Sequence, residues 1–169
     1  MNVLQRVLIA AALAGVSASA IAEDVAANAE PSTAAHESQA SPFPKGVVHK
    51  NASCGCCGAW IDHMKHNGFE MTANNVDNLG QIKEKAGVPY GMGSCHTTEI
   101  GGYFIEGHVP AAEVKRLLTE KPKAKGLTVP AMPIGSPGME SGDRVDPYEV
   151  LLVHEDGTTS VYAKYPKEE

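Results

Sequence analysis

The sequence has few basic residues, few aromatic residues and no strongly apolar run long enough for a typical membrane span. Its 14 lysine and arginine residues are outnumbered by 20 aspartate and glutamate residues, which gives a formal net charge of −6. Nucleic-acid binding needs clustered positive charge that displaces counterions, so nucleic acid is not an expected partner. The apolar run near the N-terminus is shorter than the roughly 20 residues that cross a bilayer.

Residues 1–22 have the pattern of a secretory signal peptide. One positive charge, at Arg6, precedes the apolar run VLIAAALAGVSASAIA, and small residues offer cleavage sites at Ala20 or Ala22. No cysteine stands at the cleavage site, so we expect no membrane anchor after cleavage. Removal of the segment takes away Arg6 and no acidic residue, which changes the net charge from −6 to −7. The pattern predicts a protein of the periplasm or an equivalent extracytoplasmic space.

Residues 23–44 differ in composition from the rest of the chain. They are rich in Ala, Ser and Pro and contain almost no large apolar residue. Such a segment cannot bury enough surface to offset the entropy lost on ordering, so we interpret it as a flexible tether. Residues 45–169 remain, and they are enough for one domain with a modest core.

Residues 45–169 predict an α/β domain. The expected strands are short segments bounded by turn residues, and they cover residues 46–50, 69–76, 97–100, 103–106, 148–154 and 158–165. The expected helices begin near Cys56 or Cys57 and end at Gly68, and then cover 78–87 and 110–121. A long loop rich in Gly, Pro and Met follows the third helix. This order is that of a thioredoxin-like domain with an added C-terminal β-hairpin.

Three of the four cysteines, Cys54, Cys56 and Cys57, stand within four positions. Cys54 and Cys57 have CxxC spacing where the first strand gives way to a helix, and a helix N-terminus favours thiolate over thiol. A dithiol relay has no use for a third sulfur, so Cys56 favours a metal site. Cys95 and His96 directly precede the strand expected beside the first one. We therefore expect them at the same end of the sheet as the three cysteines.

Thiolate ligands select soft ions, chiefly Cu(I) and to a lesser extent zinc. The adjacent sulfurs of the CxCC motif favour bridging of several monovalent ions over tetrahedral binding of one divalent ion. Four thiolates can neutralise up to four Cu(I) ions. The sequence therefore predicts a copper site that holds more than one Cu(I) per chain.

Three alternatives stay open at this point. Four cysteines in a secreted chain can form two disulfides, although disulfides usually join distant parts of a chain. Three cysteines and His96 can form a closed zinc site. Cys54 and Cys57 can also serve a thiol–disulfide oxidoreductase, which would need neither Cys56 nor Cys95.

The motifs resemble those of the CopG-type copper-resistance proteins, a family of periplasmic thioredoxin-like proteins long catalogued as a domain of unknown function. The resemblance runs from about Val47 to Tyr165 and rests on CGCCGAWIDHMKHNGFE, GVPYGMGSCHTTEIGGYFIEGHVPAAEV, GLTVPAMPIGSPGME and DPYEVLLVHEDG. It implies a thioredoxin-like fold that supports copper or silver resistance. The implied copper ligands belong to the CxCC and CH motifs: Cys54, Cys56, Cys57, Cys95 and His96. Interconversion of Cu(I) and Cu(II), an oxidoreductase activity, is a further implication, with other periplasmic copper-handling proteins as partners.

Met132 and Met139 are further candidate ligands in the loop PAMPIGSPGME, whose prolines and glycines would hold them in place. Thioethers suit soft copper, although methionine also fills gaps in protein cores. Histidines outside the CH motif are expected to have other roles. His63 and His66 should lie on the solvated side of the first helix, and His108 should lead into a helix start.

Overall fold

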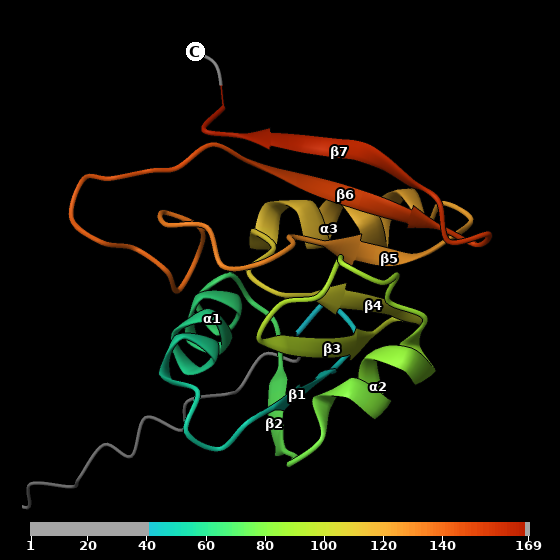
Figure 1. The fold of residues 1–169 in the computed structure, drawn as a ribbon, viewed down its shortest axis with the longest axis horizontal. Coiled ribbons are helices and arrows are strands. Elements are labelled where there is room, and N and C mark those ends of the chain that lie inside the picture. Colours follow the sequence, from blue (N-terminus) through green and yellow to red (C-terminus); the bar gives the residue numbers. More distant parts are fainter. Residues whose placement is uncertain (1–40, 168–169) are drawn as a thin grey trace, which may run out of the picture. The chain divides into compact units, whose positions relative to one another are not determined.

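The computed structural model describes residues 41–167 (Figure 1). The predicted signal peptide and residues 23–40 of the predicted tether lie outside this range. The elements follow one another as β1 (Gly46–Lys50), α1 (Gly55–His66), β2 (Met71–Asn75), α2 (Leu79–Ala86), β3 (His96–Ile100), β4 (Tyr103–Glu106), α3 (Ala111–Glu120), β5 (Ala124–Thr128), β6 (Tyr148–His154) and β7 (Thr159–Tyr165). No helix within residues 41–167 is long and apolar enough to cross a membrane.

The seven strands form one sheet in the order β2-β1-β3-β4-β5-β6-β7. Strand β1 runs parallel to β2, and β4 runs parallel to β5. The other neighbours are antiparallel. The prediction of a mixed α/β domain is therefore confirmed, and the hairpins β3–β4 and β6–β7 form where the sequence places them.

Strand β5 corrects the sequence-based interpretation, which assigned this segment to a long loop. Residues 124–128 pair with β4 on one side and β6 on the other. The lysines and Gly126 in KPKAKGLTVP hide the strand pattern, because glycine is disfavoured in strands. Here Gly126 is required, since a Cβ would collide with the carbonyl oxygen of Phe104 on β4. Three strands, not two, therefore extend the sheet beyond β4.

The hydrophobic core lies between the sheet and helices α1 and α3. Trp60 and Met64 of α1 and Val114 and Leu117 of α3 are completely buried in one cluster with Ile105 of β4. The apolar spacing of these residues along each helix gives each helix one buried stripe. Trp60 also donates a hydrogen bond of 2.9 Å from its indole nitrogen to the carbonyl oxygen of Val109, which ties α1 to the segment before α3.

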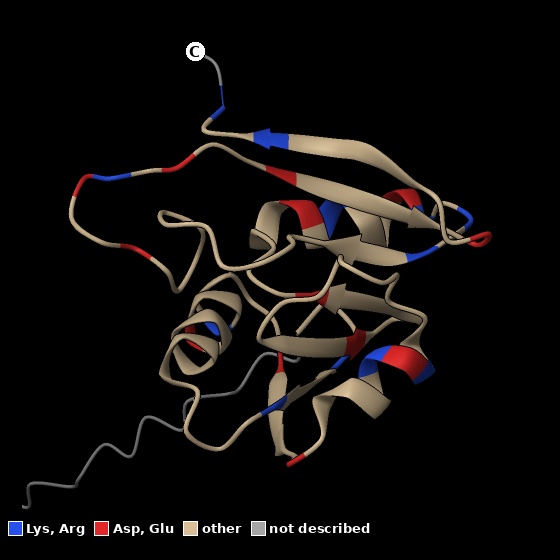
Figure 2. Cartoon of the chain, in the orientation of Figure 1, with Lys and Arg blue, Asp and Glu red and all other residues tan. Residues whose placement is uncertain are grey.

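The opposite face of the sheet carries α2, which has no buried residue of its own. Successive strand residues point to opposite faces, so Glu106 faces away from the core that Ile105 enters. Lys83 of α2 reaches Glu106 and Thr97 on this face. Figure 2 shows acidic and basic residues interspersed along the described elements.

Two further contacts join the ends of the described chain to the domain. Phe43 belongs to the segment that the sequence analysis assigns to the tether. It stacks on Phe69 with ring centroids 4.6 Å apart. Near the other end, the Tyr165 hydroxyl donates a hydrogen bond of 2.7 Å to the buried carboxylate of Glu113, which also pairs with Arg116 of α3. The C-terminal hairpin is therefore fixed to α3.

Candidate metal centre

The CxCC turn, residues 54–57, lies at the N-terminus of α1. Cys54 is the N-cap residue, and its backbone N–H donates a hydrogen bond of 3.0 Å to the carbonyl oxygen of Asn51. No side chain caps this helix end, and its first turn contains no acidic residue. The helix N-terminus therefore presents its partial positive charge to the sulfurs with no carboxylate in its first turn.

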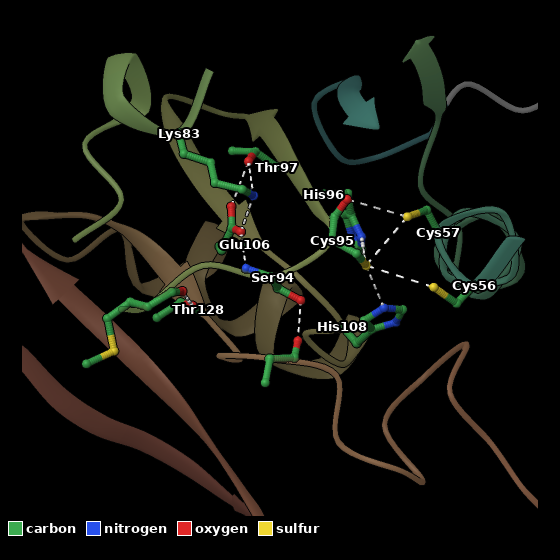
Figure 3. Close-up of polar contacts among 12 residues, drawn as sticks. Cys56, Cys57, Lys83, Ser94, Cys95, His96, Thr97, Glu106, His108 and Thr128 are labelled. Carbon is green, nitrogen blue, oxygen red and sulfur yellow. Dashed lines mark hydrogen bonds and ion pairs between the residues drawn. The ribbon is translucent and has the colours of Figure 1, made fainter. Parts of the chain in front are cut away.

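Cys95 lies next to the CxCC turn, and all four cysteine sulfurs lie within 4.8 Å of one another. Cys54 and Cys57 form a disulfide, while Cys56 and Cys95 are free thiols. The Sγ atom of Cys95 lies 3.5 Å from that of Cys57 and 3.9 Å from that of Cys56. The structure thus brings the four predicted sulfur ligands together from the start of α1 and the residue before β3. Figure 3 shows Cys56, Cys57 and Cys95 of this group.

Two buried histidines complete the group around Cys95. The Cys95 sulfur lies 3.4 Å from Nδ1 of His96 and 3.0 Å from Nε2 of His108. His108 Nδ1 lies 2.7 Å from the carbonyl oxygen of Pro137, which can only accept, so this nitrogen carries the proton. The Nε2 lone pair of His108 therefore points at the sulfur. Cys95, His96 and His108 offer ligand atoms within 4.8 Å of one another.

His108 is a candidate ligand that sequence reasoning placed elsewhere, at a helix start. The hairpin β3–β4, whose turn is Gly101-Gly102, could have indicated that His108 lies near Cys95. Thr97 pairs with Glu106, so counting two residues outward on each strand sets Cys95 opposite His108. The residue types alone do not indicate this contact, because Cys95 and His108 are 13 positions apart in the sequence.

Burial controls the protonation of this group. Removal from water, together with the nearby His108 and the positive charges of Lys83 and Lys50, lowers the pKa of His96 to about 3. Burial also lowers the pKa of His108. Burial and the neighbouring Cys56 sulfur raise the pKa of Cys95 to about 12. At neutral pH both imidazoles are therefore neutral and able to bind a metal, while the Cys95 thiol must release a proton when a metal binds.

The two methionines lie in different parts of the loop before β6. Met132 is 47% exposed and lines a hollow of about 450 Å³ that also contains Tyr148. Met139 is partly buried and follows Gly138, where a Cβ would collide with the carbonyl oxygen of Cys56. The segment around Met139 therefore covers the CxCC turn, whereas Met132 lies where the loop meets β6. Their role as ligands stays a prediction.

Comparison with known proteins adds two kinds of similarity. A sequence family described as "Protein of unknown function, DUF411" matches residues 92–139. Two solved structures, named "Copper resistance protein copG" forms 1 and 2, are each 48% identical to this chain. The match to form 1 covers 74% of this chain and 99% of the form 1 chain, with a TM-score of 0.70. The match to form 2 covers 73% of this chain and 99% of the form 2 chain, with a TM-score of 0.71. No curated protein sequence matches the chain.

The chain belongs to the CopG family of copper resistance proteins. Within this CopG-family chain, the segment that matches DUF411 contains Cys95, His96 and His108. It also contains Met139 and the segment that covers the CxCC turn. The matched residues thus hold one side of the candidate centre, and α1 supplies the other side.

Proposed function

We propose that this protein binds copper as Cu(I) in a multinuclear thiolate cluster and thereby supports copper resistance. The observation that carries this proposal is the meeting of four cysteine sulfurs within 4.8 Å of one another. Thiolates prefer monovalent copper, and sulfurs separated by 3.5 to 3.9 Å are close enough to share bridging ions. The names of the CopG structures support the same cargo.

Reduction of the Cys54–Cys57 disulfide is the first requirement of this function. An external dithiol reductant supplies the two electrons and two protons that convert the disulfide into two thiols, and is itself oxidised to a disulfide. Each of the four thiols then loses one proton when it binds copper. Four thiolates carry four negative charges, which up to four Cu(I) ions neutralise. More than one ion per chain therefore suits the site, and silver, another soft monovalent ion, suits the same ligands.

The histidines support interconversion of Cu(I) and Cu(II) at the same centre. Imidazole binds Cu(II) readily, whereas thiolates favour Cu(I). Neutral imidazoles of His96 and His108 flank the Cys95 sulfur at 3.4 Å and 3.0 Å. A centre with both kinds of ligand can hold copper in both oxidation states. We therefore extend the proposal to a copper oxidoreductase activity.

A thiol–disulfide oxidoreductase is the second candidate function, and the Cys54–Cys57 disulfide at the start of α1 favours it. Cys57 is buried and Cys54 is partly exposed, so an attacking thiolate would reach Cys54 first. The strand order β2-β1-β3-β4, with parallel β1 and β2 and antiparallel β3 and β4, supports a thioredoxin-like arrangement of this part of the sheet.

We further propose that the protein acts in the periplasm after removal of residues 1–22, together with other copper-handling proteins there. Residues 45–169 would form the copper-binding domain, with residues 23–44 as its tether. The intact mass of the exported protein tests the first step. It should correspond to a chain that begins near Glu23, and a mature chain that retained Met1 would contradict export through this segment.

Anaerobic loading of the fully reduced protein with Cu(I) tests the main proposal. Metal analysis should find more than one copper per chain, and excess zinc should not displace it. The disulfide form, loaded without a reductant, is the matched control and should bind fewer ions because two sulfurs are engaged in a bond. One tightly held zinc that copper cannot displace would indicate a closed zinc site instead.

A further inference from the structure

A buried carboxylate lies on the face of the sheet opposite the core, close to the segment that delivers Cys95. The Glu106 side chain is completely buried at the end of β4. One carboxylate oxygen accepts a hydrogen bond of 2.5 Å from the backbone N–H of Ser94, and the other accepts one of 2.7 Å from the Thr97 hydroxyl (Figure 3). Glu106 thus holds the residue before Cys95 and the residue after His96.

The same carboxylate is two residues from the third member of the group, His108. The backbone N–H of Gly107 donates a hydrogen bond of 3.0 Å to the carbonyl oxygen of His96. Gly107 has a φ of 72°, and a Cβ there would collide with the Ser94 side chain. The close approach of Ser94 to this strand end therefore depends on glycine, and Glu106 connects both chain segments that carry ligands.

The segment before Cys95 is also fixed from its other side. The Ser94 hydroxyl donates to the carbonyl oxygen of Ala131, and the Ala131 N–H donates a hydrogen bond of 3.1 Å to the carbonyl oxygen of Gly93. The Thr128 hydroxyl donates one of 2.7 Å to the carbonyl oxygen of Met92. Ser94 therefore lies between Glu106 and the chain that follows β5, with little freedom to move.

Lys83 of α2 supplies the counter-charge that a buried carboxylate needs. Its ammonium group contacts the Glu106 carboxylate and donates a hydrogen bond of 3.1 Å to the Thr97 hydroxyl. Replacing a buried ion pair by apolar side chains is often neutral or stabilising, so stability is a weak reason for this arrangement. Geometry offers a stronger reason, because Glu106 binds the residues on either side of the Cys95-His96 pair and is two residues from His108.

We propose that Glu106 is a positioning residue for the metal centre. It faces away from the core side of the sheet and does not bind copper itself. Its carboxylate holds the backbone around Cys95 so that the sulfur stays 3.5 Å from the Cys57 sulfur and 3.0 Å from His108 Nε2. The predicted effect on copper affinity rests on the proposed function, whereas the effect on the Cys95 position does not.

The test compares Glu106→Gln with Glu113→Gln. Glu113 is the matched control, because it is also a buried carboxylate paired with a basic residue, but it binds Tyr165 in the C-terminal hairpin. Thermal unfolding first identifies a temperature at which both variants are folded. Competition with a coloured Cu(I) chelator then measures affinity in reduced protein without oxygen. Glu106→Gln should lower the affinity roughly 10-fold or more, while Glu113→Gln should leave it unchanged.

A second measurement follows the position of Cys95 without copper. Mass spectrometry of the reduced, metal-free variants gives the alkylation rate of Cys95 relative to that of Cys56. Glu106→Gln should change this ratio several-fold, and Glu113→Gln should not. Should Glu106→Gln fail to fold, Thr97→Val removes one of the same hydrogen bonds and should shift the ratio in the same direction.

Two results would separate the inference from the proposed function. Equal affinities and equal alkylation ratios in the Glu106 and Glu113 variants would overturn the positioning role. A parent protein that binds no copper would overturn the proposed function, and the alkylation ratio alone would then decide whether Glu106 positions Cys95.

Discussion

The candidate centre has two sides of different construction. The CxCC turn places three sulfurs within four residues at the start of α1, and only Cys57 among them is fully buried. The strand-end group, which we define as Cys95, His96 and His108, comes from the paired ends of β3 and β4, and both its imidazoles are completely buried. The turn supplies accessible soft ligands, whereas the strand-end group supplies ligands fixed by tertiary structure.

The two sides also differ in their response to oxidation. The disulfide removes Cys54 and Cys57 as thiolate ligands and leaves one free thiol in the CxCC turn, that of Cys56. The strand-end group keeps all three of its ligand atoms. The number of free thiols available as candidate ligands is therefore set by the turn, whereas the histidine nitrogens are available in either state.

The largest expected effect comes from removing one bridging sulfur on each side. Cys95→Ser and Cys56→Ser should lower the copper bound per reduced chain by a similar, large amount, because a shared cluster loses its bridges together. Metal analysis without oxygen checks the stoichiometry. Cells that lack the protein are then supplied with either variant and grown on copper, which shows whether the variant restores copper tolerance.

The opposite pattern would favour a dithiol relay. If Cys95→Ser and Cys56→Ser both bind copper like the parent, and Cys54→Ser alone loses function, the cluster proposal is wrong. In that case disulfide exchange would depend on the attacking thiolate of the CxxC pair, and Cys95 would be dispensable.

A smaller effect is expected from His108→Gln, which changes only the strand-end group. The variant should retain copper on the sulfurs but bind it roughly 10-fold more weakly, because one nitrogen ligand and its link to Pro137 are lost. His154→Gln is the control, since His154 lies on β6 and contacts Ser160. Competition with a Cu(I) chelator measures the copper affinities of the two variants. Equal affinities would show that His108 is not a ligand of the centre.

Acid should destabilise the metal-free protein through the buried imidazoles. His96 has a pKa of about 3 when folded and an ordinary value of 6.5 when unfolded, so the unfolded state binds more protons between these limits. The free energy of unfolding should therefore fall as the pH drops from 6.5 to 3, by up to about 1.4 kcal/mol per pH unit for this group. Denaturant titrations at several pH values check the slope, which His96→Gln should reduce.

The smallest effects are expected from the methionines. Met132→Leu should lower copper affinity only slightly, because Met132 is half exposed and lines a hollow beside β6. Met139→Leu should have the larger effect of the two, since its segment covers the CxCC turn. The same chelator competition measures both variants, and a stronger effect at Met132 would contradict this ranking.

Most elements of the fold could be predicted from local patterns. The spacing of apolar residues identified α1 and α3, the Gly101-Gly102 turn identified the hairpin β3–β4, and Asn78 and Gly87 marked the ends of α2. Strand β5 was missed because its pattern makes sense only beside Phe104, where Gly126 permits close approach. A glycine that serves a neighbouring strand looks like a loop residue in the sequence alone.

The sequence by itself indicated the chemical character of the centre, because it places three cysteines within four residues at the predicted start of a helix. It also pointed to Cys95 and His96, whose position follows from the strand order. Tertiary structure alone decided that His108 faces Cys95 and that Lys83 and Glu106 meet beneath the same segment. These contacts depend on strand register and on the packing of α2, and both are set by interactions between residues far apart in the chain.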